Sequence, residues 1–153
     1  MKYPLEKEIV LFESLITKPD IVNDAVSQRG IYWHIDHSLR VIVGVSMSIQ
    51  RSKEAQYKWS FNASRTAALL AAYFPRGKAK APDRVISKEE VTVEGIQKLI
   101  KTAKTHLKAF PGLMPNQYYE HHLFGMLKKS TTKRFLKTHT KHHIKIIQDI
   151  GNL

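Results

Sequence analysis

The stretch KRFLKTHTKHHIKIIQDI, residues 133–150, has the spacing of an amphipathic helix. Its lysines recur at every fourth position, and at about 100° per residue they share one face of the helix. His139 and His143 project from the middle of the opposite face, one turn apart. That opposite face is otherwise apolar, and its residues are Phe135, Leu136, Ile146, Ile147 and Ile150. The pattern therefore predicts a helix whose core-facing side carries two histidines.

Four further segments have helical periodicity, and they lie roughly at residues 5–18, 28–53, 62–74 and from about 90 to 109. Ser27 is a candidate N-cap for the second of them. The fourth has two N-terminal signals, SKEE at residues 87–90 and TVEG at residues 92–95. The helix at residues 133–150 is expected to begin at Ser130 or Thr131 and to end before Gly151.

The segments between these helices contain weak strand signals only. RVIVGVSMSI, residues 40–49, is β-branched but lies inside a helical pattern, and FPGLMPNQYYEHHLFG, residues 110–125, is predicted to be a loop. The second long helix and the next one are too far apart for a tight helical hairpin, which indicates parallel neighbours joined by a crossover. We therefore predict one all-α domain, residues 1–153. It is a four-helix bundle with an additional short helix in the crossover between bundle helices two and three.

The composition restricts the chemistry that the chain can perform. The chain has 153 residues and no cysteine, which excludes disulfides, thiolate metal ligands and cysteine nucleophiles, and fits a reducing compartment. The N-terminus lacks the continuous apolar core of a signal peptide, and no stretch has the length and hydrophobicity of a membrane span. We expect a cytoplasmic protein with no membrane partner.

The formal net charge is +12, and most of the basic excess lies in the second half of the chain. Such a balance is typical of proteins that bind nucleic acid or another polyanion. The lysines, however, lie at helical intervals opposite apolar residues, as on any solvated helix surface. The chain also has no zinc finger and no aromatic RNA-binding motif, so a nucleic-acid partner is disfavoured.

Two histidines at positions i and i+4 of a helix can bind one metal ion, because their side chains lie about 6 Å apart. A buried histidine on its own is usually a packed residue with a hydrogen-bond partner, but two on one apolar face require two sets of partners. One metal ion would satisfy both. A third ligand is available in YWHIDHSLRV, residues 32–41, where His34 and His37 are both candidates. His142 lies at the flank of the apolar face.

Three motifs together resemble the DinB/YfiT-like superfamily, whose members are regarded as metalloenzymes. They are WHIDH at residues 33–37, PRGKAKAP at residues 75–82 and the long stretch from His121 to Ile147 that contains HTKHH. The resemblance covers residues 27–150 and is to a less characterised branch with a closing H-x-x-H-H helix. It implies an up-down-down-up helix order and a homodimer.

The resemblance also implies a divalent metal held by His37, His139 and His143, with His34 as the alternate ligand. Three histidines leave an open coordination position, which is characteristic of catalytic rather than structural sites. Hydrolysis and transfer reactions that use low-molecular-weight thiols are both attributed to this superfamily. Zinc, nickel, iron and copper all suit such a ligand set. The substrate is not identified by the sequence.

Several other residues are candidates for roles near this site. Tyr119, Glu120 and His121 are weak catalytic candidates at its rim, although aromatic loop residues often only close the end of a bundle. Asp36 is a candidate second partner for a ligand imidazole, and Arg40 a candidate contact for an anionic substrate. Two alternative functions stay open, namely a basic helical module that binds a polyanion and a metal-stabilised bundle without catalysis.

Overall fold

The computed structural model describes residues 3–77 and 80–153. Lys78 and Ala79, which belong to the predicted basic loop, lie outside the described residues. The described chain is mostly helical and contains one antiparallel two-stranded sheet. Its elements are α1 (Glu6–Leu15), α2 (Ile31–Arg51), α3 (Ala63–Ala71), α4 (Val93–Ala109), β1 (Tyr118–His121), β2 (Gly125–Lys128) and α5 (Lys129–Gly151).

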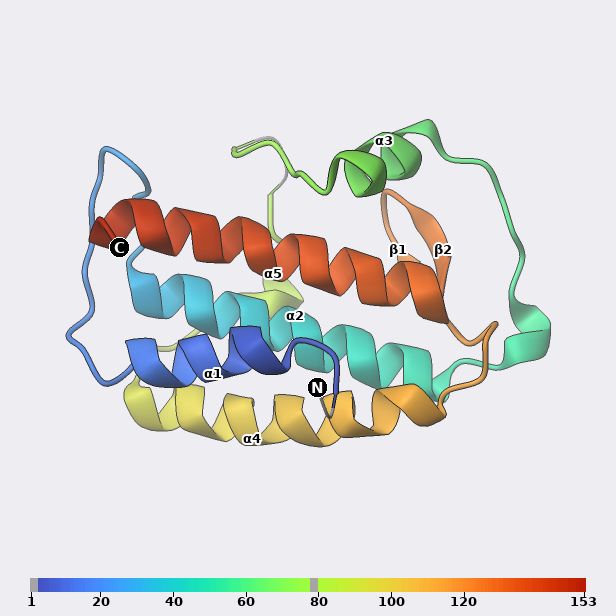
Figure 1. Cartoon of the computed structure of the whole chain (residues 1–153), viewed down its shortest axis with the longest axis horizontal. Coiled ribbons are helices and arrows are strands. Elements are labelled where there is room, and N and C mark those ends of the chain that lie inside the picture. The colour runs from blue at the N-terminus through green and yellow to red at the C-terminus, as the bar shows by residue number, and fades with distance from the viewer. Residues whose placement is uncertain (1–2, 78–79) are drawn as a thin grey trace.

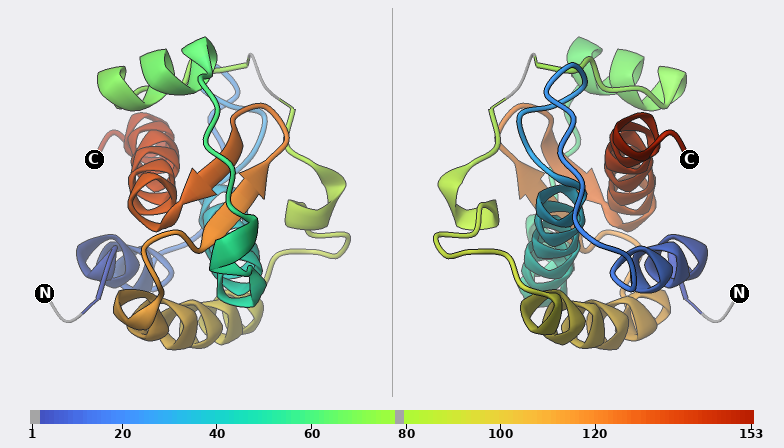
Figure 2. Two further views of the ribbon diagram at one scale, coloured as in Figure 1. Left: turned by 90° about the vertical axis from the view of Figure 1, so that its right-hand side faces the viewer. Right: turned by 90° about the vertical axis from the view of Figure 1, so that its left-hand side faces the viewer.

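Helix α2 is the central element of the fold. It packs against α4 on one side and α5 on another, while α1 lies against α4 (Figure 1). In Figure 1, α2 and α4 run from left to right, whereas α1 and α5 run from right to left. The end views in Figure 2 show α3 lying across α5, and the β1–β2 hairpin beside α2 and α5. The long segment between α2 and α4 thus joins two parallel neighbours.

The core is built from the apolar faces that the sequence periodicity predicts. In α2, the side chains of Ile35, Leu39 and Ile42 are fully buried. The apolar cluster that surrounds them includes Leu107 of α4 and Ile147 of α5. Burying a side chain of this size stabilises the fold by about 1.5–3 kcal/mol, so the α2 interfaces account for much of the hydrophobic stabilisation.

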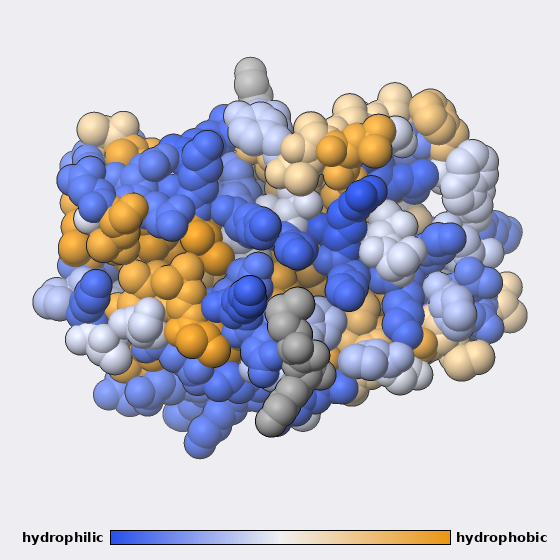
Figure 3. Space-filling model, viewed as in Figure 1, coloured by the Kyte–Doolittle hydropathy of each residue, from blue (hydrophilic) through white to orange (hydrophobic). Residues whose placement is uncertain are grey.

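The outer surface is divided between charged and apolar regions. On the face in Figure 3, hydrophilic side chains cover α4, while hydrophobic ones gather over α3 and between α1 and the C-terminal half of α5. No helix in the described part of the chain is both long and apolar enough to cross a membrane.

The prediction of an all-α fold is wrong at residues 118–128, where the expected loop contains the hairpin. Tyr119 pairs with Leu127 and His121 with Gly125, so three residues form the turn. Gly125 has a φ of 69°, a left-handed conformation that suits glycine at the end of a three-residue hairpin turn. Tyr119 and Leu127 bury their side chains. The sequence feature that could have indicated the hairpin is the pair Tyr118 and Tyr119, followed by Gly125 at the end of the turn.

The beginning of α2 also differs from the prediction, because Ser27 does not cap it. The N-cap is Gly30, which makes no side-chain hydrogen bond, and Asp20 accepts a hydrogen bond from the Tyr32 backbone N–H at 2.9 Å instead. A Cβ atom at Gly30 would lie 2.7 Å from an Asp20 carboxylate oxygen, so any other residue there would displace the Asp20 side chain. The Ser27 hydroxyl instead lies 3.0 Å from the Nε2 of His34.

The ring of His121 holds the hairpin turn together. Its Nδ1 accepts hydrogen bonds from the backbone N–H groups of Leu123 and Phe124, at 3.1 and 3.2 Å, and the ring stacks on Phe124. Burial, with nearby His122 and Arg84, lowers the pKa of His121 from 6.5 to about 4. Both bonds require an unprotonated Nδ1.

Acidification should therefore destabilise the protein through His121. Between about pH 6.5 and pH 4 the unfolded chain binds a proton at this residue that the folded chain does not bind. Stability contributed by His121 is present above pH 6.5 and falls as the pH decreases, by no more than about 1.4 kcal/mol per pH unit. Urea unfolding of wild type and His121→Asn across this range should show a smaller loss in the variant, whose amide oxygen accepts without titrating.

The matched control for this measurement is His122→Asn, because His122 is the exposed neighbour of His121. It should change the pH dependence of the free energy of unfolding less than His121→Asn does, because it keeps both turn hydrogen bonds and removes only a smaller contribution to the pKa of His121. Equal pH dependence in wild type and His121→Asn would contradict the assigned role.

Of the two N-terminal signals proposed for α4, the second is the one used. Thr92 is the N-cap, and its side chain accepts a hydrogen bond from the Gly95 backbone N–H at 3.1 Å. Ser87, in the earlier signal, donates instead to the Glu89 carbonyl oxygen in the preceding segment.

Thr92→Ala should lower the free energy of unfolding by about 1 kcal/mol, because it removes this cap. Ser87→Ala should change the free energy by less than about 0.5 kcal/mol. Chemical denaturation of the two variants beside wild type measures both values, and equal effects would contradict the assignment of the cap.

Candidate metal centre

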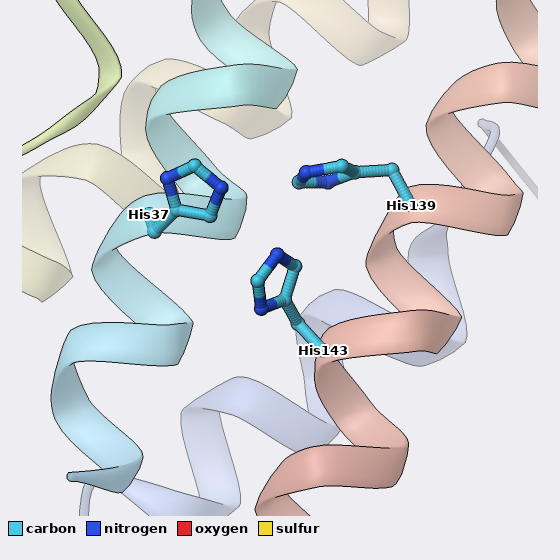
Figure 4. A group of neighbouring side chains, drawn as sticks. All are labelled: His37, His139 and His143. Carbon is cyan, nitrogen blue, oxygen red and sulfur yellow. The ribbon is translucent and has the colours of Figure 1, made fainter. Parts of the chain in front are cut away.

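Three histidines from two neighbouring helices meet in the interior. His37 comes from α2, and His139 and His143 come from successive turns of α5 (Figure 4). One nitrogen from each ring can be chosen so that all three lie within 4.8 Å of one another. Figure 4 shows the rings converging on one common space. The helix spacing and the α2–α5 packing together therefore produce a set of donors suitable for one ion.

The separation of these nitrogens is slightly wider than a bound ion requires. Ligand nitrogens at 2.1 Å from a tetrahedral zinc lie about 3.4 Å apart. The longest of these separations is at most 4.8 Å, so the nitrogens would have to approach one another by up to about 1.4 Å to bind the ion. Imidazole is a common ligand for zinc, copper, iron and nickel, so the donor set fits a divalent transition metal.

His37 is held in an orientation suitable for metal binding by the crossover segment. Its Nδ1–H donates to the carbonyl oxygen of Val85 at 3.0 Å, in the 3₁₀ turn Asp83–Val85. This bond leaves the lone pair on Nε2, the second ring nitrogen. Trp33 stacks on the same ring with a centroid distance of 5.1 Å and an interplanar angle of 7°. The tautomer and the plane of His37 are thus both determined.

His139 differs from His37, whose Nδ1 is hydrogen-bonded. The buried Nδ1 of His139 has no hydrogen-bond partner in the described structure. Its ring lies among aromatic side chains, with Phe135 at 5.8 Å and Phe74 at 6.4 Å between centroids. A buried polar atom without a partner costs about 1–3 kcal/mol.

His143 does have a partner, and that partner is His34. The two Nδ1 atoms lie 3.0 Å apart, and both residues are buried. His34 is therefore outside the three-histidine group, and its role as an alternate ligand stays a prediction. His142, predicted at the flank of the apolar face, lies edge-on to His143.

The histidines of the group are neutral at neutral pH. Burial, and then the neighbouring histidines, lowers the pKa of both His139 and His143 well below the usual 6.5. Burial also lowers the pKa of His37, although the Val85 hydrogen bond and Asp36 act in the opposite direction. Neutral imidazole is the form that binds metal, so these shifts favour coordination.

Asp36 and Arg40 bind each other rather than the site. The Arg40 Nε donates to an Asp36 carboxylate oxygen at 2.7 Å. In the described structure the hydrogen-bond partner of the His37 Nδ1 is the Val85 carbonyl oxygen and not Asp36. Sequence patterns did not indicate Val85, because a backbone carbonyl can come from any residue type.

The three rim candidates all belong to strand β1. The Tyr119 hydroxyl accepts a hydrogen bond from Arg84 at 3.2 Å, Glu120 is exposed, and His121 is engaged in the turn. Phe135 connects this strand to the site, because its ring touches Tyr119, His121 and His139. Phe135, with Tyr119 and His121 packed against it, thus forms a wall beside His139.

His139→Leu should stabilise the metal-free protein. The change removes a buried nitrogen that has no partner and should raise the free energy of unfolding by roughly 1–2 kcal/mol. The matched control is His106→Leu in α4, which removes a histidine that is bonded to Gln50 and should give no such gain. Urea denaturation in the presence of a chelator measures both, and a destabilised His139→Leu would contradict the prediction.

No family model, no curated protein and no solved structure matches this chain.

Proposed function

We propose that this protein is a metal-dependent enzyme of the DinB/YfiT-like kind, with one divalent transition metal held by His37, His139 and His143. The observation that carries the proposal is the convergence of three neutral imidazoles from α2 and α5 within 4.8 Å of one another, with His37 and His143 buried and His139 partly buried. The resemblance of the three sequence motifs supports it. So do the helix directions in Figure 1, which fit a four-helix bundle of up-down-down-up order.

The number of ligands favours a catalytic role over a purely structural one. Structural zinc sites are almost always closed by four protein ligands, whereas catalytic sites use three and leave one position open. Among the described residues, the group that can hold an ion contains three. Bound there, a divalent ion would supply Lewis-acid chemistry, which either activates a water for hydrolysis or positions a thiolate for transfer.

The surrounding residues supply binding, orientation and exclusion of water. The Val85 carbonyl fixes the ring of His37, and Phe74 and Phe135 cover His139. A dry, apolar wall strengthens every electrostatic interaction beside it, because the local dielectric constant is low. We infer that substrate reacts on the side of the site that these rings enclose.

A surface groove of about 540 Å³ adjoins this wall and is the proposed approach for substrate. Phe74 and His142 line it, and these residues contact His139 and His143 respectively. Arg76, Lys141 and Lys145 also line the groove, so it suits a substrate with an anionic group. Arg76 is partly neutralised by an ion pair with Asp149 at 2.6 Å.

We also propose a homodimer, as the resemblance implies. Large apolar side chains are exposed in and before α3, where Trp59, Phe61 and Leu70 are 71–72% exposed. Together with Tyr73 and Leu123 they give a surface that a second copy would bury.

Metal analysis of protein purified without a histidine tag tests the proposed function. Wild type should contain about one equivalent of a transition metal, and His139→Ala/His143→Ala should contain none, because two of three ligands are lost. His106→Ala, which removes a histidine bonded to Gln50 in α4, should retain the metal. The loaded protein is then screened with ester, amide and thiol-transfer substrates.

Two results would contradict the proposal. Wild type that binds no metal, even after incubation with zinc, nickel and iron, would refute the metal site. Tight binding to nucleic acid that weakens steeply with salt and is unaffected by His143→Ala would instead support a polyanion-binding module.

A further inference from the structure

A chain of polar contacts leads from His143 to the segment that precedes α2. The His143 Nδ1 lies 3.0 Å from the His34 Nδ1, and the His34 Nε2 lies 3.0 Å from the Ser27 Oγ. His34 is only 4% exposed, so water does not compete freely for these atoms. Ser27 Oγ also accepts the backbone N–H of Arg29 at 3.0 Å, which anchors the outer end of the chain.

Two neutral imidazoles in contact allow two arrangements of protons. In the first, His143 Nδ1–H donates to His34 Nδ1, and His34 Nε2–H donates to Ser27 Oγ. In the second, the Ser27 hydroxyl donates to His34 Nε2, and His34 Nδ1–H donates to His143 Nδ1. Each histidine carries one ring proton in both cases, so the arrangements differ only in the direction of the bonds.

Only the first arrangement lets His143 bind a metal ion. It leaves a lone pair on the Nε2 of His143, and one nitrogen of this ring points toward His37 and His139 in Figure 4. In the second arrangement Nε2 carries the proton, and the lone pair on Nδ1 is used by His34. Neither nitrogen of His143 is then available.

From this geometry we propose that His34 is a positioning residue, which accepts the Nδ1 proton of His143 and thereby presents the His143 Nε2 to a divalent metal. This inference rests on the proposed metal site and assigns a role to a histidine outside the three ligands. Partners of this type orient ligating histidines in many metal sites, and their removal typically weakens metal binding 10–100-fold. In most of those sites the partner is a carboxylate or a backbone carbonyl.

The packing around His34 is suited to this role. Trp33 lies edge-on to His34 with a centroid distance of 5.1 Å, and its ring stacks on His37. The guanidinium of Arg29 lies 5.5 Å from the Trp33 ring centroid. Trp33 thus restrains the positioning residue and a proposed ligand together. A neutral acceptor also avoids burying a carboxylate, whose desolvation is more costly.

Zinc affinity, measured by competition with a chromophoric chelator, tests the proposal. His34→Phe removes the acceptor and should weaken zinc binding about 10–100-fold. His34→Asn should bind within a few-fold of wild type, because its amide oxygen can take the place of Nδ1. His106→Phe is the control: it also removes a helix imidazole, but one that is bonded to Gln50 outside the histidine group, and it should bind as wild type does.

Nitrogen-15 NMR of the zinc-loaded wild type provides a readout that does not depend on any variant folding. His143 should carry its proton on Nδ1 and be zinc-bound at Nε2, and His34 should carry its proton on Nε2. A zinc-bound nitrogen on His34, or unchanged zinc affinity in a folded His34→Phe, would overturn the proposal.

The outcomes separate this inference from the proposed function. Zinc binding with the expected proton positions, but without any catalysed reaction, would support the role of His34 and refute the enzyme. Zinc binding that is insensitive to His34→Phe would overturn the role of His34 and leave the metal site standing. A wild type that binds none of zinc, nickel and iron would overturn both.

Discussion

The α2–α5 interface is the contact on which the site depends. Most of this interface is apolar, and Leu39 of α2 and Ile147 of α5 are fully buried within the core. Four imidazoles occupy its remaining part: His34 and His37 from one helix, and His139 and His143 from the other. Apolar packing therefore brings together polar rings that would otherwise remain hydrated. The free energy gained by burying the apolar side chains offsets the cost of removing these rings from water.

The four rings differ in how their polar atoms are satisfied, and these differences indicate their roles. His37 is bonded to a backbone carbonyl, and His143 is bonded to His34. His139 keeps a buried nitrogen without a partner in the described structure. In the metal-free protein such a nitrogen is costly, because an apolar side chain of similar size would leave no buried polar atom unpaired there.

The segments outside the long helices complete the site. The crossover contributes the Val85 carbonyl and the ring of Phe74, and the hairpin contributes Tyr119 and His121 against Phe135. The segment before α2 contributes Ser27, through His34. Apart from the Ser27–His34 contact, these contacts join residues that are well separated in sequence. The long helices carry the three histidines, and the connecting segments orient or cover them.

The sequence by itself determined the helices and the identity of the histidine pair. Periodicity of 3.6 residues placed His139 and His143 on one apolar face, and α2 and α5 begin and end within a few residues of the predicted positions. These features are local, so the helical repeat suffices to predict them. Only the tertiary structure decided between His34 and His37, because both lie on the buried side of α2 one turn apart. Their distances to α5 and Val85 separate them, and neither distance is encoded in local spacing. The hairpin was missed for the same reason, since a short strand is stabilised by its partner and by the helices it packs against.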